Sequence, residues 1–286
     1  MAIEPWVLLD EDLSPRDEAR ISPFDRGFLF GDGLYEGMKV LSGRPLFLDR
    51  HLERLAYGLE ALRIPLDLGA LADRLHRLIA ANGTDAGFLY LQITRGAATE
   101  RRHLPPPGLR PTVFAFVERR GFPLPAGAPQ RAMTLADFRW RRADLKGTSL
   151  LGTTLGKLAA ARSGADEVIW RGERGRLLEG GNTNVFVRSA RGLETAPLGH
   201  RLLPGVTRGL VLDFAHRRGL PIVLRAPRLA ERSGWLEVFV TGTVTGVQAV
   251  VELDGLAVAE GRVGEWTRSL AEDLAAAEWA AAGWSA

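Results

Sequence analysis

The sequence contains no cysteine, only three lysines and no long apolar run. The lack of cysteine excludes a disulfide framework, a thiolate metal site and cysteine catalysis. Because only Lys39, Lys146 and Lys157 carry a side-chain amine, any chemistry that requires one has three candidates. No apolar run reaches the roughly 18 residues that a membrane span needs, and the N-terminus lacks the basic and apolar regions of a signal peptide. We therefore expect a cytoplasmic protein with no membrane partner.

The charged residues are rich in arginine but nearly balanced in sign. The 286 residues include 37 Lys plus Arg and 34 Asp plus Glu, which gives a net charge of +3. Nucleic-acid-binding proteins usually gather basic residues on one face, whereas the arginine pairs here are scattered among acidic residues. We therefore expect no nucleic-acid partner and a surface on which most arginines are solvated.

The length and composition suit one large globular domain or two of ordinary size. The densest Pro/Gly stretch is GFPLPAGAP, at residues 121–129, and such stretches typically join domains. The sequence therefore predicts a small domain over 1–120, a linker over 121–129 and a larger domain over 130–286.

Helical and strand periodicities occur on both sides of this linker, which predicts the α+β (α/β) class. Helices are predicted at 49–62 (capped by Asp49), 68–81, 153–163 and 208–217, and from 265 on. Strands are predicted at 88–94, 112–118, 133–137, 167–170, 185–187, 222–224, 238–241 and 249–253. Apolar residues punctuated by glycines over 21–43 predict further strands joined by tight turns.

Lys146 stands out among the three lysines because it lies between a predicted strand and a predicted helix. Segments of this kind present side chains into clefts, and a lysine amine attacks aldehydes when its surroundings favour the neutral form. Position alone favours an ordinary surface lysine, so both interpretations stay open. Lys157, in a predicted helix, is expected on an exposed face, and Lys39 shares a strand face with Tyr35 and Gly37 if the alternation holds.

Glu179 is a lone acidic residue in the segment LLEGGNTNVFV, residues 177–187. It could be a carboxylate held at the mouth of a strand, with close backbone approach at Gly180 and Gly181. The alternative is an ordinary turn before a strand, which the spacing alone favours.

Two further segments have features that suit phosphate. In RLLPGVTRGLVLDFA, Pro204 and Gly205 lead into a predicted helix with Thr207 near its start, where backbone N–H groups and the helix dipole favour an anion. A plain helix cap explains this pattern equally well. In FVTGTVTGV, over 239–247, alternating Thr and Gly offer small donors beside flexible backbone, or mark a β-bulge.

The loop ITRGAATERRHLPPPG carries Arg101 and His103, which point the same way if the segment is extended. Arginine offers a planar fork for a carboxylate, and histidine adds a donor. In isolation, such a pair on a Pro-rich loop is usually just exposed.

The order of these segments resembles the fold-type IV family of pyridoxal-phosphate enzymes. That family includes D-amino acid aminotransferases, branched-chain aminotransferases and aminodeoxychorismate lyase. The resemblance extends from residue 25 to about residue 270, over DRGFLFGDGLYEGMKV, RHLERL, YLQITRG, RWRRADLKGTSLLG, LEGGNTNVF, LLPGVTR and VTGTVTGV. It implies two mixed domains, a small N-terminal one and a larger C-terminal one that binds the cofactor.

The resemblance also implies roles for individual residues and no metal. Lys146 corresponds to the lysine that links the cofactor and moves a proton from the substrate α-carbon. Glu179 corresponds to the carboxylate that keeps the pyridine nitrogen protonated, so that the ring is an electron sink. Arg54 and backbone and hydroxyl donors at Val206, Thr207 and Thr243 correspond to the residues that bind the cofactor phosphate.

The substrate is implied by Arg101 and His103, which with Tyr35 are similar to the carboxylate-binding residues of D-amino acid aminotransferases. In relatives of that subgroup the Arg-x-His pair reaches across a dimer interface into the partner's site. The resemblance therefore implies ping-pong transamination between a D-amino acid of the D-alanine or D-glutamate type and a 2-oxo acid. It further implies a homodimer whose active site lies at the interface.

Several departures from the family pattern leave alternatives open. The loop over 96–103 is one residue longer than usual, Gly37 replaces a bulkier residue, and Gly242 and Val244 stand where hydroxyl residues are common. These changes suggest a reshaped pocket and the hypothesis of activity on (R)-amines. The alternatives are an aminodeoxychorismate lyase, a branched-chain L-aminotransferase, an arginine-rich RNA-binding module without a cofactor, and a family member with only a structural role.

Overall fold

A computed structural model describes residues 2–122 and 129–284, which form two compact units. Unit 1 contains the described residues of 2–122, 145–149 and 280–284, and unit 2 contains those of 129–144 and 150–279. The segment 145–149, with Lys146, thus belongs to the first unit, although it follows the predicted linker. Most of that linker, residues 123–128, lies outside the described residues. No helix in the described ranges is long and apolar enough to cross a membrane.

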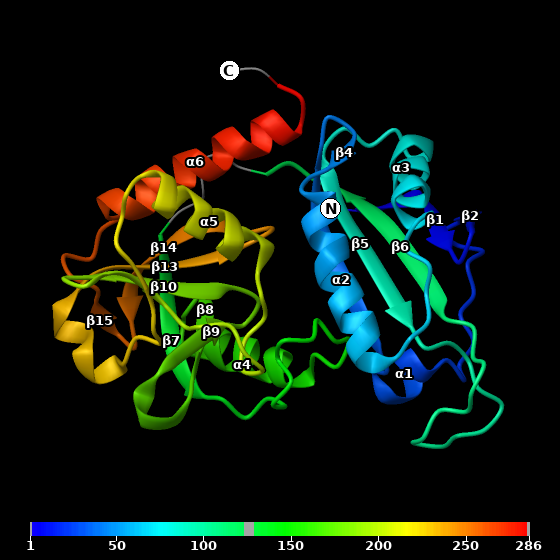
Figure 1. Ribbon diagram of the computed structural model, residues 1–286, viewed down its shortest axis with the longest axis horizontal. Coiled ribbons are helices and arrows are strands. Elements are labelled where there is room, and N and C mark those ends of the chain that lie inside the picture. Colours follow the sequence, from blue (N-terminus) through cyan, green and yellow to red (C-terminus); the bar gives the residue numbers. More distant parts are fainter. Residues whose placement is uncertain (1, 123–128, 285–286) are drawn as a thin grey trace. The chain divides into compact units, whose positions relative to one another are not determined.

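Unit 1 is built on a six-stranded antiparallel sheet in the order β2-β1-β6-β5-β3-β4. Its helices α2 (Leu48–Leu62) and α3 (Leu71–Ala81) pack their apolar faces on one side of the sheet, where they build the core of this unit (Figure 1). The strands are β1 (Ala2–Leu9), β2 (Asp12–Pro15), β3 (Gly33–Leu41), β4 (Arg44–Pro45), β5 (Gly87–Thr94) and β6 (Thr112–Arg119). Alternation along β5 places Leu89 and Leu91 in the core and Tyr90 on the opposite face.

Two local predictions for unit 1 are wrong. A short helix α1 (Arg26–Phe30) lies within 21–43, where only strands and turns were expected, because the Asp25 side chain caps the Gly27 N–H and Gly31 ends the helix at φ +65°. Glycine at a helix end gives the same sequence signal as glycine in a hairpin turn. The cap of α2 is Phe47, not Asp49, which lies in the first helical turn.

Unit 2 contains a mixed sheet whose strands close into a ring. Along the order β12-β11-β10-β13-β14-β7-β8-β9, the last strand pairs again with β10, so that six strands form a closed barrel. The strands are β7 (Gln130–Ala136), β8 (Glu167–Arg171), β9 (Leu177–Gly180), β10 (Asn184–Ser189), β11 (Gly192–Thr195), β12 (Ile222–Leu224), β13 (Trp235–Gly242), β14 (Gly246–Leu253) and β15 (Leu256–Ala257). Aliphatic residues of these strands, such as Ile169, Val185 and Val240, fill a common core. Closure leaves few unpaired edges.

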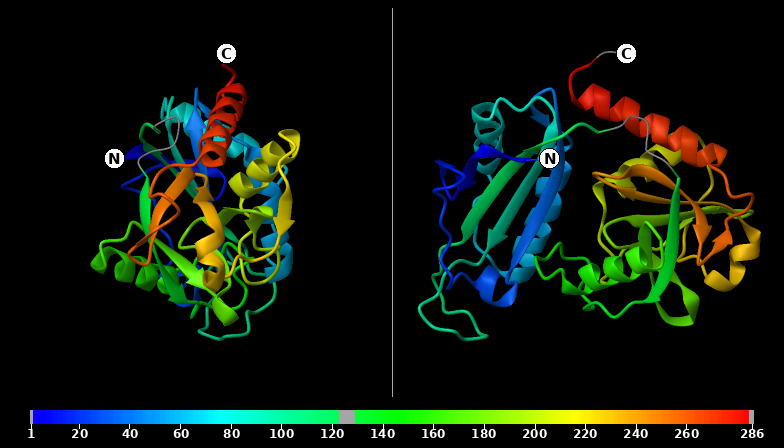
Figure 2. Two further views of the ribbon diagram at one scale, coloured as in Figure 1. Left: turned by 90° about the vertical axis from the view of Figure 1, so that its left-hand side faces the viewer. Right: turned by 180° about the vertical axis from the view of Figure 1, so that it is seen from behind.

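The helices predicted after the linker are confirmed as α4 (Leu151–Arg162), α5 (Val206–Arg217) and α6 (Glu265–Ala281), whose last two residues belong to unit 1. Two short 3-10 helices, η1 (Glu173–Gly175) and η2 (Leu229–Gly234), complete the described elements. Helix α4 packs on β7 and β8, and α5 packs on β12 and β13 (Figures 1 and 2). Mixed helices and sheets in both units confirm the α+β class.

Candidate active site

Lys146 lies in unit 1, where its segment is fixed to the beginning of β3. The Tyr35 N–H donates to the Lys146 carbonyl at 2.9 Å, and Leu34 forms a β-bridge with Gly147. The Lys146 Nζ lies 4.2 Å from the centre of the Tyr35 ring, within cation–π range. The structure thus brings together two of the predicted site residues, Lys146 and Tyr35.

Arg54 belongs to a buried polar cluster in the same unit. Its Nε and Nη2 donate to the two carboxylate oxygens of Glu36 at 2.8 and 2.7 Å, and His51 Nδ1 lies 2.7 Å from Glu36 Oε2. Burial raises the pKa of Glu36, but Arg54 and His51 outweigh it and lower the pKa to about 2. Burial lowers the pKa of His51, as do the positive charges of Arg54 and Lys146. Glu36 therefore holds the Arg54 guanidinium in place within the field of Lys146.

Glu179 lies in unit 2 near the end of β9 and is 4% exposed. Arg139 Nη1 donates to its Oε1 at 2.7 Å, and the Leu203 N–H donates to Oε2 at 2.8 Å. Asp137 in turn fixes Arg139, with 3.0 Å between Asp137 Oδ1 and Arg139 Nε. Burial raises the pKa of Glu179 to about 7, even though Arg139 and the Leu203 N–H lower it. A cationic group placed beside Glu179 would stabilise its charged form.

Asn184 connects the strands and the loop around Glu179. It pairs with Glu179 across β9 and β10 and with Thr241 across β10 and β13. Its Nδ2 donates to the Leu203 carbonyl at 2.9 Å, and a Cβ on Gly205 would lie 2.0 Å from its Oδ1. Only glycine fits at position 205, so Asn184 and the start of α5 approach closely.

The N-terminus of α5 offers donors without a capping side chain. Helix α5 begins at Val206, its N-cap is Gly205, and its first turn contains no acidic residue. The first backbone N–H groups of a helix lack intrahelical partners and carry the positive end of the dipole. Thr207 is buried in this turn. The predicted phosphate donors Val206 and Thr207 therefore lie on an end that suits an anion.

The end of β13 adds hydroxyl groups to unit 2. Thr241 Oγ1 is buried and has no hydrogen-bond partner in the part of the chain that the structure describes. Thr243 follows in the turn between β13 and β14 and is half-buried. A buried hydroxyl without a partner is costly, and a phosphate oxygen would satisfy it. These donors, together with Glu179, fit the phosphate and the ring nitrogen of pyridoxal phosphate.

Arg101 and His103 lie on the exposed loop between β5 and β6 of unit 1. Both contact the same ring: Arg101 Cζ lies 5.0 Å from the centre of Phe30, and the His103 ring lies 5.6 Å from it. The contacts of Tyr35 among the described residues are instead with Lys146 and with the Tyr90 ring, 5.7 Å away. The structure therefore brings Arg101 and His103 together on the Phe30 ring.

The two other lysines have structural partners. Lys157 Nζ lies 3.2 Å from Glu167, whose buried carboxylate also accepts from the Thr183 hydroxyl and the Gly181 N–H. Lys157 is thus part of an ion pair rather than a plain surface lysine, and its side chain is 42% exposed. Lys39 is buried, with its Nζ 5.2 Å from the centre of the Phe122 ring.

Sequence reasoning missed Glu36, His51, Arg139 and Asn184. Glu36 had a detectable signal, since a charged residue between apolar ones in a strand demands a partner. Arg139 and Asn184 had none, because their roles depend on contacts with residues far along the chain, 40 positions in the case of Arg139 and Glu179.

Known proteins resemble the chain over nearly its whole length. The family described as amino-transferase class IV matches residues 33–253. The D-alanine aminotransferase of Staphylococcus haemolyticus is 33% identical over 274 residues, which cover 93% of this chain and 95% of that protein. The branched-chain amino acid aminotransferase of Escherichia coli superposes with a TM-score of 0.85 at 22% identity and covers 93% and 92% of the two chains. A hypothetical aminotransferase from Mycobacterium tuberculosis in its PLP-bound form has a TM-score of 0.82 at 23% identity, with 96% and 99% covered.

The two kinds of comparison carry different information. The solved structures, below 25% identity, establish the fold. The family match and the sequence relative extend over the segments that hold Lys146, Glu179 and Thr207. The chain therefore belongs to the class IV aminotransferases, the fold-type IV enzymes that depend on pyridoxal phosphate.

Proposed function

We propose that this aminotransferase exchanges the amino group of a D-amino acid, of the D-alanine or D-glutamate type, with a 2-oxo acid. The observation that carries the proposal is the 33% identity with a D-alanine aminotransferase over 93% of the chain. The placement of Arg101 and His103 on one Phe30 ring supports it further, because the pair can act together on a substrate carboxylate.

Lys146 is the proposed cofactor-linking and proton-transferring residue. Pyridoxal phosphate, when bound, supplies a ring that accepts the electron pair of the substrate Cα–H bond. The Lys146 amine takes the proton from the α-carbon and later returns one, as a general base and then a general acid. Its fixed backbone, bonded to Tyr35, limits the positions from which it acts.

Glu179 and the donors of unit 2 hold the cofactor in this proposal. Glu179 would bind the ring nitrogen and favour its protonated form, since a carboxylate that burial has destabilised gains most from a cationic neighbour. Val206 and Thr207, on the positive end of α5, and Thr243 bind the phosphate. Arg54 adds a positive charge that Glu36 holds in place.

Arg101, His103 and Tyr35 are the proposed substrate-binding residues. The guanidinium and imidazole donate to the substrate carboxylate, which fixes the face of the α-carbon that Lys146 reaches. The ring contacts of Arg101 and His103 are with Phe30, and those of Tyr35 are with Lys146 and Tyr90. We therefore propose a homodimer in which the loop of one protomer serves the site of its partner.

The alternatives within the family differ in substrate. A branched-chain L-aminotransferase is the alternative that the solved structures bring forward, although at 22% identity they speak only to the fold. An aminodeoxychorismate lyase would use the same Lys146 and Glu179. Activity on (R)-amines was suggested in part by Gly37, whose small size would enlarge the pocket. A Cβ at position 37 would lie 2.6 Å from the Phe88 ring, so Phe88 already occupies that space.

The decisive experiment is the absorbance spectrum of the cofactor-loaded protein before and after addition of D-alanine, L-alanine, L-leucine or (R)-1-phenylethylamine. Each amino donor that reacts converts the bound cofactor to its amine form, and the oxo product is measured separately. We expect conversion and pyruvate formation with D-alanine. Conversion with L-leucine and not D-alanine would overturn the proposal in favour of the branched-chain alternative.

Replacement of Lys146 tests the assignment of the amine. Lys146→Ala is expected to remove the absorbance band of the linked cofactor and to lower kcat by about 10⁴-fold or more. Lys157→Arg is the matched control, since it keeps the ion pair with Glu167 and is expected to retain both. A Lys146→Ala protein with the band and the turnover of the parent would contradict the assignment.

A further inference from the structure

A buried side chain of helix α1 bonds the backbone of the loop that carries Arg101 and His103. Arg26, the first residue of α1, donates from Nη1 to the Arg102 carbonyl at 2.6 Å and from Nη2 to the His103 carbonyl at 2.9 Å. Its side chain is 4% exposed. Two of the Arg26 donors therefore bond the backbone of the proposed substrate-binding loop.

Arg26 is itself held by an acidic residue that it shares with a second arginine. Its Nε donates to Asp32 Oδ2 at 2.8 Å, and Arg95 donates to both Asp32 oxygens at 2.8 and 3.0 Å. Burial raises the pKa of Asp32, but the bonds from Arg95 and Arg26 outweigh it and lower the pKa. The carboxylate is thus charged at neutral pH and fixes the planes of both guanidinium groups.

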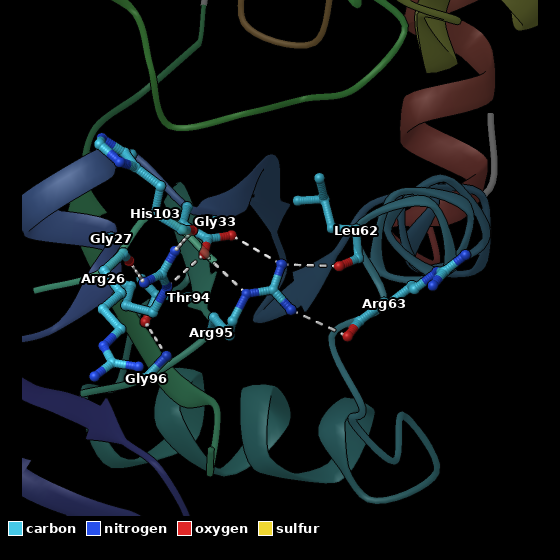
Figure 3. Close-up of polar contacts among 12 residues, drawn as sticks. Arg26, Gly27, Gly33, Leu62, Arg63, Thr94, Arg95, Gly96 and His103 are labelled. Atoms are coloured by element: carbon cyan, nitrogen blue, oxygen red, sulfur yellow. Dashed lines mark hydrogen bonds and ion pairs between the residues drawn. The ribbon is translucent and has the colours of Figure 1, made fainter. Parts of the chain in front are cut away.

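The two arginines share Asp32 but reach different parts of unit 1. The remaining donors of Arg95 bond the carbonyls of Leu62 and Arg63, at 2.8 and 3.1 Å, where α2 ends (Figure 3). Figure 3 also shows Arg26 and His103 in this cluster. Arg26 alone of the two bonds the substrate-binding loop, so the pair offers a matched comparison.

The base of the loop is fixed independently of the Arg26 side chain. Asp25 accepts from the hydroxyls of Thr94 and Thr112 at 2.9 and 2.7 Å, which joins the strands on either side of the loop. A Cβ on Gly96 would lie 1.9 Å from the Arg110 carbonyl, so the two ends of the loop are in close contact. Replacement of Arg26 would therefore free residues 101–103 while the ends of the loop stay in place.

Phe30 completes the support on the same face of α1, four residues after Arg26. The Arg26 guanidinium lies 4.7 Å from the centre of its ring, and the same ring contacts Arg101 and His103. Helix α1 thus contacts the loop in two ways: Arg26 bonds the backbone of the loop, and Phe30 contacts the side chains of Arg101 and His103.

We propose that Arg26 is a positioning residue for substrate-carboxylate binding and that it acts by holding the backbone at residues 102 and 103. The inference rests on the proposed function, in which Arg101 and His103 bind that carboxylate. Arg26 does not touch the substrate in this arrangement; it fixes the direction in which its neighbours on the loop point. The planar fork of arginine suits two adjacent carbonyls, and a lysine ammonium keeps the charge toward Asp32 but not the fork.

The kinetic test compares Arg26→Lys with Arg95→Lys in the cofactor-loaded enzyme. Loss of two charge-assisted hydrogen bonds to the loop is expected to raise the KM for D-alanine and for pyruvate about tenfold, with kcat within about threefold of the parent. Arg95→Lys, which leaves the Arg26 bonds to the loop in place, is expected to lower thermal stability with little change in KM. Phe30→Leu removes the ring that both side chains contact and is expected to raise KM as well.

Hydrogen–deuterium exchange gives a readout that is independent of activity. Amides over 99–104 are expected to exchange about tenfold faster in Arg26→Lys than in the parent, whereas in Arg95→Lys the faster exchange is expected near 62–64. Unchanged loop exchange and unchanged KM in Arg26→Lys and Phe30→Leu would overturn the inference. A parent enzyme that does not convert D-alanine would overturn the proposed function, whereas unchanged exchange of the loop amides in Arg26→Lys would overturn the role of Arg26. The two failures are therefore distinguishable.

Discussion

At the scale of single residues, the pKa values of two buried carboxylates, Glu36 and Glu179, shift in opposite directions because their partners differ. Glu36 accepts from Arg54 and lies against His51, and these partners lower its pKa to about 2. Glu179 has one arginine and one backbone N–H, which do not outweigh burial, and its pKa is raised to about 7. Glu36 is thus a satisfied structural anion, whereas Glu179 is poised to bind a cation. This difference supports Glu179 rather than Glu36 as the partner of a protonated ring nitrogen.

The raised pKa of Glu179 predicts how the stability of the cofactor-free protein depends on pH. A carboxyl whose pKa is higher in the folded state stabilises that state fully below about pH 4.5 and loses this contribution as the pH rises through about 7. Replacement by Gln, in Glu179→Gln, is expected to remove a decline of about 3 kcal/mol in the free energy of unfolding between pH 4.5 and 8. Urea denaturation at both pH values measures it.

Glu36→Gln serves as the comparison for that experiment. Because the pKa of Glu36 is lowered, its contribution is present above about pH 4.5 and is lost as the pH falls towards 2. This variant is expected to be destabilised at pH 7 by about 3 kcal/mol, since it breaks a buried pair, and to keep the decline due to Glu179. Equal pH profiles for Glu179→Gln and the parent would contradict the assignment of that decline to Glu179.

At the scale of secondary structure, the end of α1 and the Lys146 segment are in contact. Gly31, which ends α1, has φ +65°, and a Cβ there would lie 2.1 Å from Ser149 Oγ. The Thr148 hydroxyl donates to the Gly31 carbonyl at 3.1 Å. The glycine that ends α1 is therefore also the space into which the segment 145–149 fits.

This contact predicts that a single methyl group reduces activity from a distance. Gly31→Ala is expected to displace the segment that carries Lys146 and to lower kcat about tenfold or more, in addition to a loss of about 1–2 kcal/mol from the left-handed backbone. Gly43→Ala is the matched control, because its φ is +68° and its nearest neighbour, the Thr84 carbonyl, is 3.9 Å away. Unfolding measurements and kcat on both variants separate backbone strain from displacement, and equal kcat values would contradict the prediction.

The elements differ in how well the sequence predicts them. Helices with strong amphipathic periodicity, such as 71–81, lie where the apolar spacing places them, because burial against the sheet and local propensity agree. Helix α1 has only five residues, and β9 only four. Both are too short for periodicity to show. The local caps Asp25 and Gly31 define α1, and tertiary contacts define β9. Strand β9 forms because it pairs with β8 and β10. The four residues of β9 do not themselves indicate these neighbours.

The site follows the same pattern. Lys146 and Glu179 stand out in the sequence because their residue types are rare in such positions and because they occur in the family's order. The contacts that give them their properties, Tyr35 for Lys146 and Arg139 for Glu179, come from folding. The proposed site residues of unit 1 are Lys146, Tyr35, Arg54, Arg101 and His103, and those of unit 2 are Glu179, Val206, Thr207 and Thr243.

At the scale of the whole molecule, the proposed homodimer has a physical argument in unit 1. Large apolar side chains around α1 and on the substrate-binding loop are exposed, among them Phe24 at 62%, Phe28 at 77% and Leu104 at 82%. Where such side chains gather into one contiguous patch, the patch typically marks an interface. Leu104 follows His103 directly in the chain, and Phe24 and Phe28 lie close in sequence to Phe30, which contacts Arg101 and His103. This arrangement is consistent with a loop that one protomer donates to its partner.

The expected molar mass in solution is twice the 31.2 kDa of the chain, as measured by light scattering. Charges at two of these exposed apolar positions, in Phe28→Glu combined with Leu104→Glu, are expected to produce monomers and to raise the KM for D-alanine about tenfold or more. The double variant Glu53→Gln with Glu60→Gln, on the exposed side of α2, is expected to remain dimeric. A monomeric parent with full activity would contradict the proposal.

Because residues 145–149 belong to unit 1, the place at which two relatives are joined in a chimera matters. The amine is encoded beyond the linker, yet it is folded into the unit that the first part of the gene encodes. A chimera joined at the linker would combine the lysine segment of one parent with the β3 surface of the other. Grafts between relatives should therefore exchange residues 145–149 together with the N-terminal unit, so that Ser149 and Gly31 come from the same parent.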